Sequence, residues 1–208
     1  MKFAIIGATG NVGRKIIEVL EKSDISVENL YLVASKKSAG QKLKFKKKDI
    51  VVEQLENYDF SKAQITIFAA GSDVAKNWAL KAAKKTIVID NSKHFRMDKD
   101  VPLVVAEVNP EQLDNHKNLI ANPNCSTIQL MLPLKPLHDK YKIKRVIVST
   151  YQAVSGAGKA SVDELFSQTK DYLDNKKINS KNFTKQMAFN LIPHIDSFVD
   201  DGYTKEEW

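Results

Sequence analysis

A single cysteine stands where its thiol would be reactive. Cys125 is the only cysteine in the chain; it follows the turn Asn122-Pro123-Asn124 and precedes Ser126 to Leu132, an apolar stretch typical of a helix start. Asn124 suits an N-cap, because its side chain can accept a hydrogen bond from a first-turn N–H. Free N–H groups and the helix dipole favour negative charge there, and the thiolate is the nucleophilic form of cysteine. We therefore predict that Cys125 is a catalytic nucleophile; the alternative is an inert, buried small hydrophobe.

A glycine-rich turn has the spacing of a phosphate-binding loop. The apolar run Lys2–Ile6 leads into Gly7-Ala-Thr-Gly-Asn-Val-Gly13, which is followed by apolar residues at helical spacing. A strand, a glycine turn and a helix in this order place a pyrophosphate at the helix amino end. Gly7 would permit the tight turn, Gly10 the close approach of the backbone, and Gly13 the packing of helix on strand. A structural turn without ligand is the alternative, because the spacing differs from the commoner G-x-G-x-x-G.

The next predicted strand, Leu30–Ala34, bears on the choice of cofactor. Sheets that bind NAD often place Asp or Glu at the end of this strand, where the carboxylate holds the ribose 2′-hydroxyl. Here the residues are Ser35-Lys-Lys-Ser-Ala-Gly40. Hydroxyls and lysines suit a 2′-phosphate, which a carboxylate would repel, so we predict NADP as the cofactor. The alternative is a loop whose lysines are only solvated.

Strands and helices alternate along the chain. Further strands are expected at Ile50–Gln54, Ile65–Ala70, Thr86–Asp90 and Arg145–Tyr151, and helices at Asp73–Lys84 and Ser161–Leu173. Such alternation is typical of the α/β class with a doubly wound parallel sheet. Gly71 follows one of these strands, at the sheet edge where α/β proteins bind ligands.

Composition excludes several classes of protein. The hydrophobic fraction of 43% and the charged fraction of 27% are those of a globular protein. The net charge of +7 is concentrated in Lys42, Lys44 and Lys46–Lys48, which alternate with Leu43 and Phe45; this favours an edge strand over a nucleic-acid-binding surface. No apolar run has the length of a membrane span. A single cysteine excludes an intrachain disulfide, as expected of a cytoplasmic protein.

Taken together, these motifs resemble the aspartate-semialdehyde dehydrogenase family. The blocks that carry the resemblance are Gly7–Gly13, Asn91 with Phe95-Arg96, Val101–Val105 with Glu107-Val108-Asn109, Asn122–Thr127, Tyr151–Gly158 and Gly202–Glu207. They occur in the family's order over essentially the whole chain. The cysteine block and the Gln152 block are the most specific of them.

The resemblance implies roles for individual residues. Cys125 matches the nucleophile that forms an acyl-thioester, Gln152 the residue that orients the substrate, and Arg96 and Asn124 positions that bind phosphate. The positions that match cofactor contacts are Gly7, Thr9, Gly10, Asn11, Val12, Gly13, Ser35, Lys36, Ser38, Ala39, Gly71, Ser155 and Gly156. No metal is implied.

The family that this sequence resembles continues beyond the last matching block. Its general-base histidine and several substrate-binding groups lie there, whereas this chain ends at Trp208. The remaining histidines, His94, His116, His138 and His194, stand in other motifs. We therefore expect a Rossmann-type NADP-binding domain over residues 1–124, followed by the start of an α+β catalytic and dimerisation domain over 125–208. Thr204 and Glu207 have the spacing of a helix cap at the start of a further helix.

The implied activity is reduction of L-4-aspartyl phosphate to L-aspartate 4-semialdehyde and phosphate, in the biosynthesis of lysine through diaminopimelate and of threonine, methionine and isoleucine. The implied partner is a second copy of the chain, as a homodimer, with little turnover from a chain that lacks the base. Three alternatives stay open: an N-acetyl-glutamyl-phosphate reductase, against which the Gln152 block argues; a non-catalytic nucleotide-binding module; and a nucleic-acid binder suggested only by the charge.

Overall fold

The computed structural model describes residues 1–207, and the chain divides into two compact units between Thr150 and Tyr151. Trp208 lies outside the described residues, so the expected helix start is seen only as far as Glu207. There the Thr204 N–H and hydroxyl donate to Glu207 Oε2 at 2.7 and 2.8 Å. The expected pairing of Thr204 with Glu207 is therefore present, within a turn.

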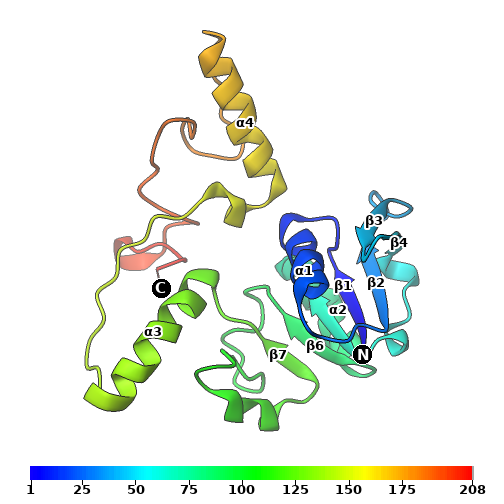
Figure 1. Ribbon diagram of the computed structural model, residues 1–208. Helices are drawn as coiled ribbons and strands as arrows, with labels where there is room; N and C mark the ends of the chain where they lie inside the picture. The colour runs from blue at the N-terminus through cyan, green and yellow to red at the C-terminus, as the bar shows by residue number, and fades with distance from the viewer. Residues whose placement is uncertain (208) are drawn as a thin grey trace. The chain divides into compact units, whose positions relative to one another are not determined.

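The described part of the first unit contains one sheet of seven strands, in the order β3-β4-β2-β1-β5-β6-β7 (Figure 1). The strands are β1 (Lys2–Ile6), β2 (Asn29–Ala34), β3 (Lys42–Phe45), β4 (Lys48–Gln54), β5 (Ile65–Phe68), β6 (Ile87–Asp90) and β7 (Leu119–Ala121). Only the β3–β4 pair is antiparallel. Counted along the chain, the six parallel strands have the order 3-2-1-4-5-6 of a dinucleotide-binding sheet. The predicted α/β fold with a doubly wound parallel sheet is confirmed.

The helices follow the predicted positions closely. They are α1 (Asn11–Lys22), α2 (Ser72–Ala83), α3 (Cys125–Tyr141) and, in the second unit, α4 (Lys159–Leu173). Short 3-10 turns are η1 (Leu55–Asn57), η2 (Phe60–Lys62), η3 (Pro110–Asn115), η4 (Val154–Ala157) and η5 (Asp200–Gly202). Helix α1 begins directly after Gly10, so the glycine loop itself supplies its first turn.

Alternating residues of the central strand serve two hydrophobic cores. Phe3 and Ile5 of β1 pack with residues of α1, whereas Ala4 and Ile6 pack with the alanines of α2. Successive side chains of a strand point to opposite faces of its sheet. The two helices therefore cover opposite faces (Figure 1), which explains why β1 is apolar at every position from Phe3 to Ile6.

The lysine-rich segment forms the edge of the sheet, as predicted. Strand β3 pairs only with β4, through a two-residue turn in which Lys46 and Lys47 have φ of 45° and 66°. Leu43 and Phe45 are buried, while Lys42 and the other lysines are exposed. Lysines on an edge strand hinder pairing with other chains.

The prediction of a strand at Arg145–Tyr151 is wrong for this structure. These residues belong to no strand, and Ile147 and Tyr151 are 79% and 88% exposed. A strand forms only with a hydrogen-bonded neighbour, and no β-ladder or isolated bridge among the described residues includes this segment. High β-propensity therefore gives an extended conformation here without a sheet. The expected domain division at residues 124 and 125 stays a prediction.

Helix α4 is tied to the following segment by two buried polar side chains. Gln168, 1% exposed, donates to the Asn179 carbonyl at 3.2 Å and accepts from the Met187 and Ala188 N–H groups at 2.7 and 3.1 Å. Glu164, 8% exposed, accepts from the N–H groups that follow Ser180. Burial would raise the pKa of Glu164, but these hydrogen bonds outweigh it and hold the pKa below its usual value. Polar contacts thus hold the irregular segment on α4.

We expect Gln168→Ala to loosen the segment that Gln168 holds. The change leaves the buried Ala188 N–H and the partly buried Met187 N–H without an acceptor, at a cost of about 1–3 kcal/mol. Hydrogen exchange at Met187 and Ala188 should accelerate accordingly, since exchange reports local opening. Lys170→Ala, at an exposed position of α4, is the matched control. Unchanged protection of both amides would contradict this account of the second unit.

Candidate active site

The glycine loop leaves space for a ligand at one position only. A Cβ atom on Gly13 would lie 2.2 Å from the Gly7 carbonyl oxygen, and one on Gly7, whose φ is 86°, would lie 2.6 Å from the Ala69 oxygen. Both glycines are therefore required by the packing of the protein itself. At Gly10 a Cβ would meet only the Gly7 oxygen, at 3.4 Å. The absence of a side chain at Gly10 thus leaves an open cradle at the start of α1.

The turn after β2 lies against this cradle. The Thr9 hydroxyl donates to Ser38 Oγ at 3.3 Å, and the Ser38 and Ala39 N–H groups donate to the Ser35 carbonyl at 2.9 and 3.1 Å. Residues expected at the pyrophosphate and at the adenosine end are therefore neighbours. The Lys36 side chain of the same turn is exposed.

A cavity of about 480 Å³ connects these parts with the carboxyl ends of neighbouring strands. Its lining includes Gly7, Thr9, Gly10 and Ser35 among the predicted residues, and Leu55, Glu56, Asp73, Val74, Asn77 and Trp78, which the sequence did not indicate. These further residues come from η1 and α2. Only the sheet order brings them to the glycine loop, so no local motif could have revealed them. Gly71, with φ of 86°, forms the turn that starts α2.

Glu56 brings a carboxylate to the cavity that the sequence did not predict. The carboxylate accepts hydrogen bonds from the Glu56 backbone N–H and from the Gln54 side chain. These bonds, together with the nearby positive charge of Lys36, lower the pKa of Glu56. The carboxylate is therefore ionised at neutral pH. An acid is absent from the end of β2 but present beyond the end of β4, the strand beside it.

Cys125 lies at the start of α3, as predicted. The Asn124 side chain accepts from the Ser126 N–H at 2.9 Å, which caps the helix. The cysteine is exposed, so its thiol is accessible to reagents and substrates. The arrangement places an accessible sulfur beside the unpaired N–H groups of a helix amino end.

The structure brings Arg96 to the turn that precedes Cys125. Arg96 Nε donates to the Asn122 carbonyl at 3.0 Å, and Nη2 donates to the Asn91 carbonyl at 3.1 Å. The sequence also allowed a surface arginine paired with Asp98 or Asp100; neither contact is of that kind, and Asp100 is ion-paired with Lys117. Arg96 and the cysteine turn, 26 residues apart at their contact, thus form one local structure.

Gln152, Ser155 and Gly156 belong to the second unit. Gln152 Nε2 donates to Glu206 Oε1 at 3.4 Å, and Ser155 and Gly156 lie in η4. Their approach to Cys125 and to the cofactor stays a prediction.

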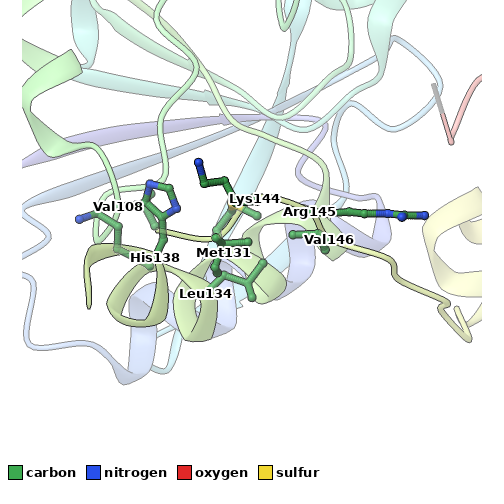
Figure 2. A pocket seen from close by; sticks show the side chains of 9 residues that line it. Val108, Met131, Leu134, His138, Lys144, Arg145 and Val146 are labelled. Carbon is green, nitrogen blue, oxygen red and sulfur yellow. The ribbon is translucent and has the colours of Figure 1, made fainter. Parts of the chain in front are cut away.

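A second hollow, of about 300 Å³, contains none of the predicted site residues. Figure 2 shows it between the later turns of α3 and the segment that follows, with Met131 and Leu134 on the helix and Val146 opposite. Its lining is mainly apolar, with His138, Lys144 and Arg145 at the sides. Two of its lining residues, Arg145 and Val146, come from the segment that was expected to be a strand.

Two kinds of site are not found among residues 1–207. No three His, Cys, Asp or Glu side chains are grouped as they would be around a metal ion. No helix in this range is long and apolar enough to cross a membrane.

Known proteins resemble this chain along most of its length. The family profile described as semialdehyde dehydrogenase, NAD binding domain, matches residues 2–116, and the profile of the semialdehyde dehydrogenase dimerisation domain matches residues 134–208. Aspartate-semialdehyde dehydrogenase of Vibrio mimicus is 48% identical over 98% of this chain and 66% of its own length. The enzyme of the same name from Aquifex aeolicus is 51% identical over 99% of this chain and 62% of its own length.

A solved structure agrees with these relatives. Aspartate semialdehyde dehydrogenase II of Vibrio cholerae, in its complex with ASA, superposes with a TM-score of 0.96 at 48% identity. The match covers 99% of this chain and 62% of that one. The chain therefore spans less than two thirds of the length of the relatives it matches.

The glycine loop yields a prediction that separates packing from ligand binding. Gly10→Ala should leave the free energy of unfolding within about 1 kcal/mol of the parent but weaken binding of a nicotinamide dinucleotide about tenfold or more, because the methyl group occupies the open cradle. Gly13→Ala should instead destabilise the fold by about 1–3 kcal/mol through overpacking. Urea unfolding and fluorescence titration measure the two effects. Parent-like cofactor affinity in Gly10→Ala would show that the cradle holds no ligand.

Proposed function

The chain belongs to the semialdehyde dehydrogenase family, and on that premise we propose that it carries the cofactor and nucleophile parts of an aspartate-semialdehyde dehydrogenase. The proposed reaction reduces L-4-aspartyl phosphate to L-aspartate 4-semialdehyde and phosphate with NADPH. The observation that supports it most directly is Cys125, exposed at the capped amino end of α3 and joined through its turn to Arg96.

The pathway and setting proposed with this reaction are biosynthetic. The product would serve lysine, through diaminopimelate, and threonine, methionine and isoleucine, in the cytoplasm. The match of residues 134–208 to a dimerisation domain supports a homodimer. A division into an NADP-binding domain over 1–124 and a catalytic and dimerisation domain over 125–208 belongs to the same proposal.

The residues at the glycine loop fit a nicotinamide dinucleotide. Gly10 and the first turn of α1 would hold the pyrophosphate, because N–H groups at a helix amino end bind anions. Asn11, Val12 and Gly13 supply that turn. When bound, the reduced nicotinamide would supply the hydride. Gly71, with Ser155 and Gly156 of the second unit, would complete the contacts.

Cys125 would act as the nucleophile. Its thiolate attacks the carbonyl carbon of the acyl phosphate, the carbon–oxygen bond to phosphate breaks, and a thioester forms on the sulfur. Hydride addition to the thioester carbon gives a hemithioacetal; the carbon–sulfur bond then breaks, releasing the aldehyde and regenerating the thiolate. N–H groups at the start of α3 would stabilise the negative oxygen during these steps. Arg96 and Asn124 would bind the phosphate, and Gln152 would orient the substrate.

The described histidines do not supply an evident general base. His116 Nδ1 accepts from the Asn118 N–H just before β7, at the opposite end of the strand from the cysteine turn. His138 lies about 20 Å along α3 from Cys125, at about 1.5 Å per residue. His94 packs edge-on against Phe95, at 4.5 Å between ring centroids. His194 belongs to the second unit, where its ring lies on Phe198.

Cofactor choice would depend on opposing charges in and beside one cavity. Ser35 lines the cavity, and with Ser38 and Lys36 of the adjoining turn it favours a 2′-phosphate, whereas the ionised Glu56 of the cavity lining disfavours it. We propose NADP because the turn that touches the glycine loop, through Thr9 and Ser38, carries the hydroxyls and the lysine, while Lys36 offsets the charge of Glu56.

The parent chain should bind NADP(H) more tightly than NAD(H). Ser38→Asp places a negative charge beside Thr9 and should narrow or invert the difference between the two dissociation constants. Glu56→Gln removes a negative charge from the same cavity and should widen it. Titration of nicotinamide fluorescence gives the four constants needed for each comparison. Equal affinities in the parent chain would refute the proposed preference.

Acyl transfer to Cys125 can be tested without complete turnover. Mixed with L-aspartate 4-semialdehyde and NADP, but without phosphate, the chain should release up to one NADPH per chain and gain the mass of the acyl group on Cys125. Cys125→Ser should show neither change while binding NADP normally. A burst with N-acetyl-glutamate semialdehyde alone would favour the N-acetyl-glutamyl-phosphate reductase. Cofactor binding without a burst on either aldehyde would favour a non-catalytic nucleotide-binding module.

Steady-state turnover with phosphate tests the general base. The 208-residue chain should turn over about a hundred- to ten-thousand-fold more slowly than a version extended to the relatives' full length, the range for loss of a general base. Comparable rates would show that a histidine of this chain serves as base, and His194→Ala would be the first variant to examine.

A further inference from the structure

Two asparagines occupy equivalent positions just beyond neighbouring strands. Asp90 and Ala121, the last residues of β6 and β7, are register partners. Asn91 and Asn122 follow them directly, and the Asn122 N–H donates to the Asp90 carbonyl at 2.8 Å, which continues the ladder by one residue. Equivalent positions of adjacent parallel strands point to the same face. The two side chains are therefore neighbours, and Asn122 Nδ2 donates to Asn91 Oδ1.

Arg96 joins the backbones of the same two residues. Its Nε donates to the Asn122 carbonyl at 3.0 Å and its Nη2 to the Asn91 carbonyl at 3.1 Å. A guanidinium group is planar, with its donors in a rigid fork. Two acceptors on two strand ends therefore fix the plane of the group, provided that the strand ends keep their spacing. The amide pair of Asn91 and Asn122 holds that spacing.

The cysteine turn continues directly from this arrangement. Only Pro123 and Asn124 separate Asn122 from Cys125, and the proline ring restricts its own φ. Asn124 must then place its side chain on the Ser126 N–H, 2.9 Å away, for α3 to begin at Cys125. A change in the orientation of the Asn122 peptide would move the cap and the first turn of α3 together.

We propose that Asn91 and Asn122 are positioning residues for the nucleophile and for Arg96. Their amide pair, together with the two carbonyls that receive Arg96, forms a strand-end clamp that sets the direction in which the chain leaves β7 for Cys125. The clamp rests on the proposed function, in which Cys125 attacks and Arg96 binds phosphate. It acts without touching the substrate.

The clamp explains why positions 91 and 122 both carry a neutral amide side chain. One residue must donate and the other accept, and neither can bear a charge that would draw Arg96 off the carbonyls. Asn91→Asp retains an oxygen that accepts from Asn122 Nδ2. Asn122→Asp removes that donor and places a carboxylate oxygen against Asn91 Oδ1. The two changes add the same charge at neighbouring places, so their difference isolates the hydrogen bond.

The test compares Asn122→Asp with Asn91→Asp in the 208-residue chain. Two quantities are measured at neutral pH. The first is the rate at which iodoacetamide alkylates Cys125, and the second is the concentration of inorganic phosphate that halves this rate. Because Cys125 is already exposed, alkylation reports the environment of the sulfur and not its accessibility. Asn122→Asp should slow alkylation and raise the phosphate concentration for half protection, each about two- to tenfold beyond Asn91→Asp, the range for one hydrogen bond. NADP affinity should be unchanged in both.

Asn118→Ala controls for loss of stability. Asn118 stands at the opposite end of β7, where its Nδ2 donates to the Ala83 carbonyl at 3.1 Å and its φ is 59°. This variant should destabilise the sheet without changing alkylation or phosphate protection. Should Asn122→Asp fail to fold, Asn122→Ala and Asn91→Ala replace the pair; each should slow alkylation, and the double variant should be no slower than either.

Equal rates in Asn122→Asp and Asn91→Asp would overturn the clamp, as would an equal loss in Asn118→Ala. In the replacement series, alkylation at the parent rate in both alanine variants would do the same. Failure of the proposed function has a different signature: phosphate would not protect Cys125 even in the parent chain, and no acyl group would form on it. The clamp would then stand or fall on the alkylation rates alone.

Discussion

The register of the parallel strands is the constraint on which the rest of the first unit depends. The residue after each of four strands still donates to a neighbouring strand: Gly7 to Val33, Ala69 to Ile6, Asn91 to Phe68 and Asn122 to Asp90, all at 2.8–3.0 Å. The strands therefore end at one level, and the loops that follow them leave from the same edge. The glycine loop, the arginine loop and the cysteine turn therefore lie along one edge of the sheet although they are far apart in the chain. This is the edge at which open α/β sheets bind their ligands.

The spacing of the three glycines in the first loop leaves room at that edge for a ligand. Gly13 brings α1 so close to the loop that a methyl group would clash with the Gly7 oxygen, and only Gly10 leaves its space empty. The same short motif thus serves two needs, close packing and ligand access. The cavity is near charges of both signs, because Glu56 is in its lining and Lys36 is in the turn beside it. In the proposed function, cofactor preference is then a balance between groups that follow two adjacent strands.

The two units depend on different interactions. The sheet of the first unit is sandwiched between two hydrophobic cores. The second is held largely by Gln168 and Glu164, whose hydrogen bonds replace the missing regular structure of residues 179–188. Between these regions, the residues of α3 are not buried and Ile147 is 79% exposed. Apolar sequence there does not by itself produce a packed layer.

Much of the fold was determined by local sequence. Apolar runs, helical spacing and glycine turns depend on residues within one or two turns of each other. Strands β1, β2, β4, β5 and β6, helices α1 and α2, and the Asn124 cap were therefore predicted at nearly their observed positions. The lysine-bearing edge strand was likewise readable from its alternation.

Only the tertiary structure decided which residues share the site. Glu56 and Trp78 reach the cavity because β4 and β5 lie on either side of the β1–β2 pair, and Arg96 meets the cysteine turn because β6 pairs with β7. The segment from Arg145 to Tyr151 shows the converse, since its residues favour a strand and yet belong to no β-ladder among the described residues. Local propensity depends on a residue and its chain neighbours, whereas a hydrogen-bonded ladder requires a second strand at the right register. That second requirement is met, or not, only when the chain has folded.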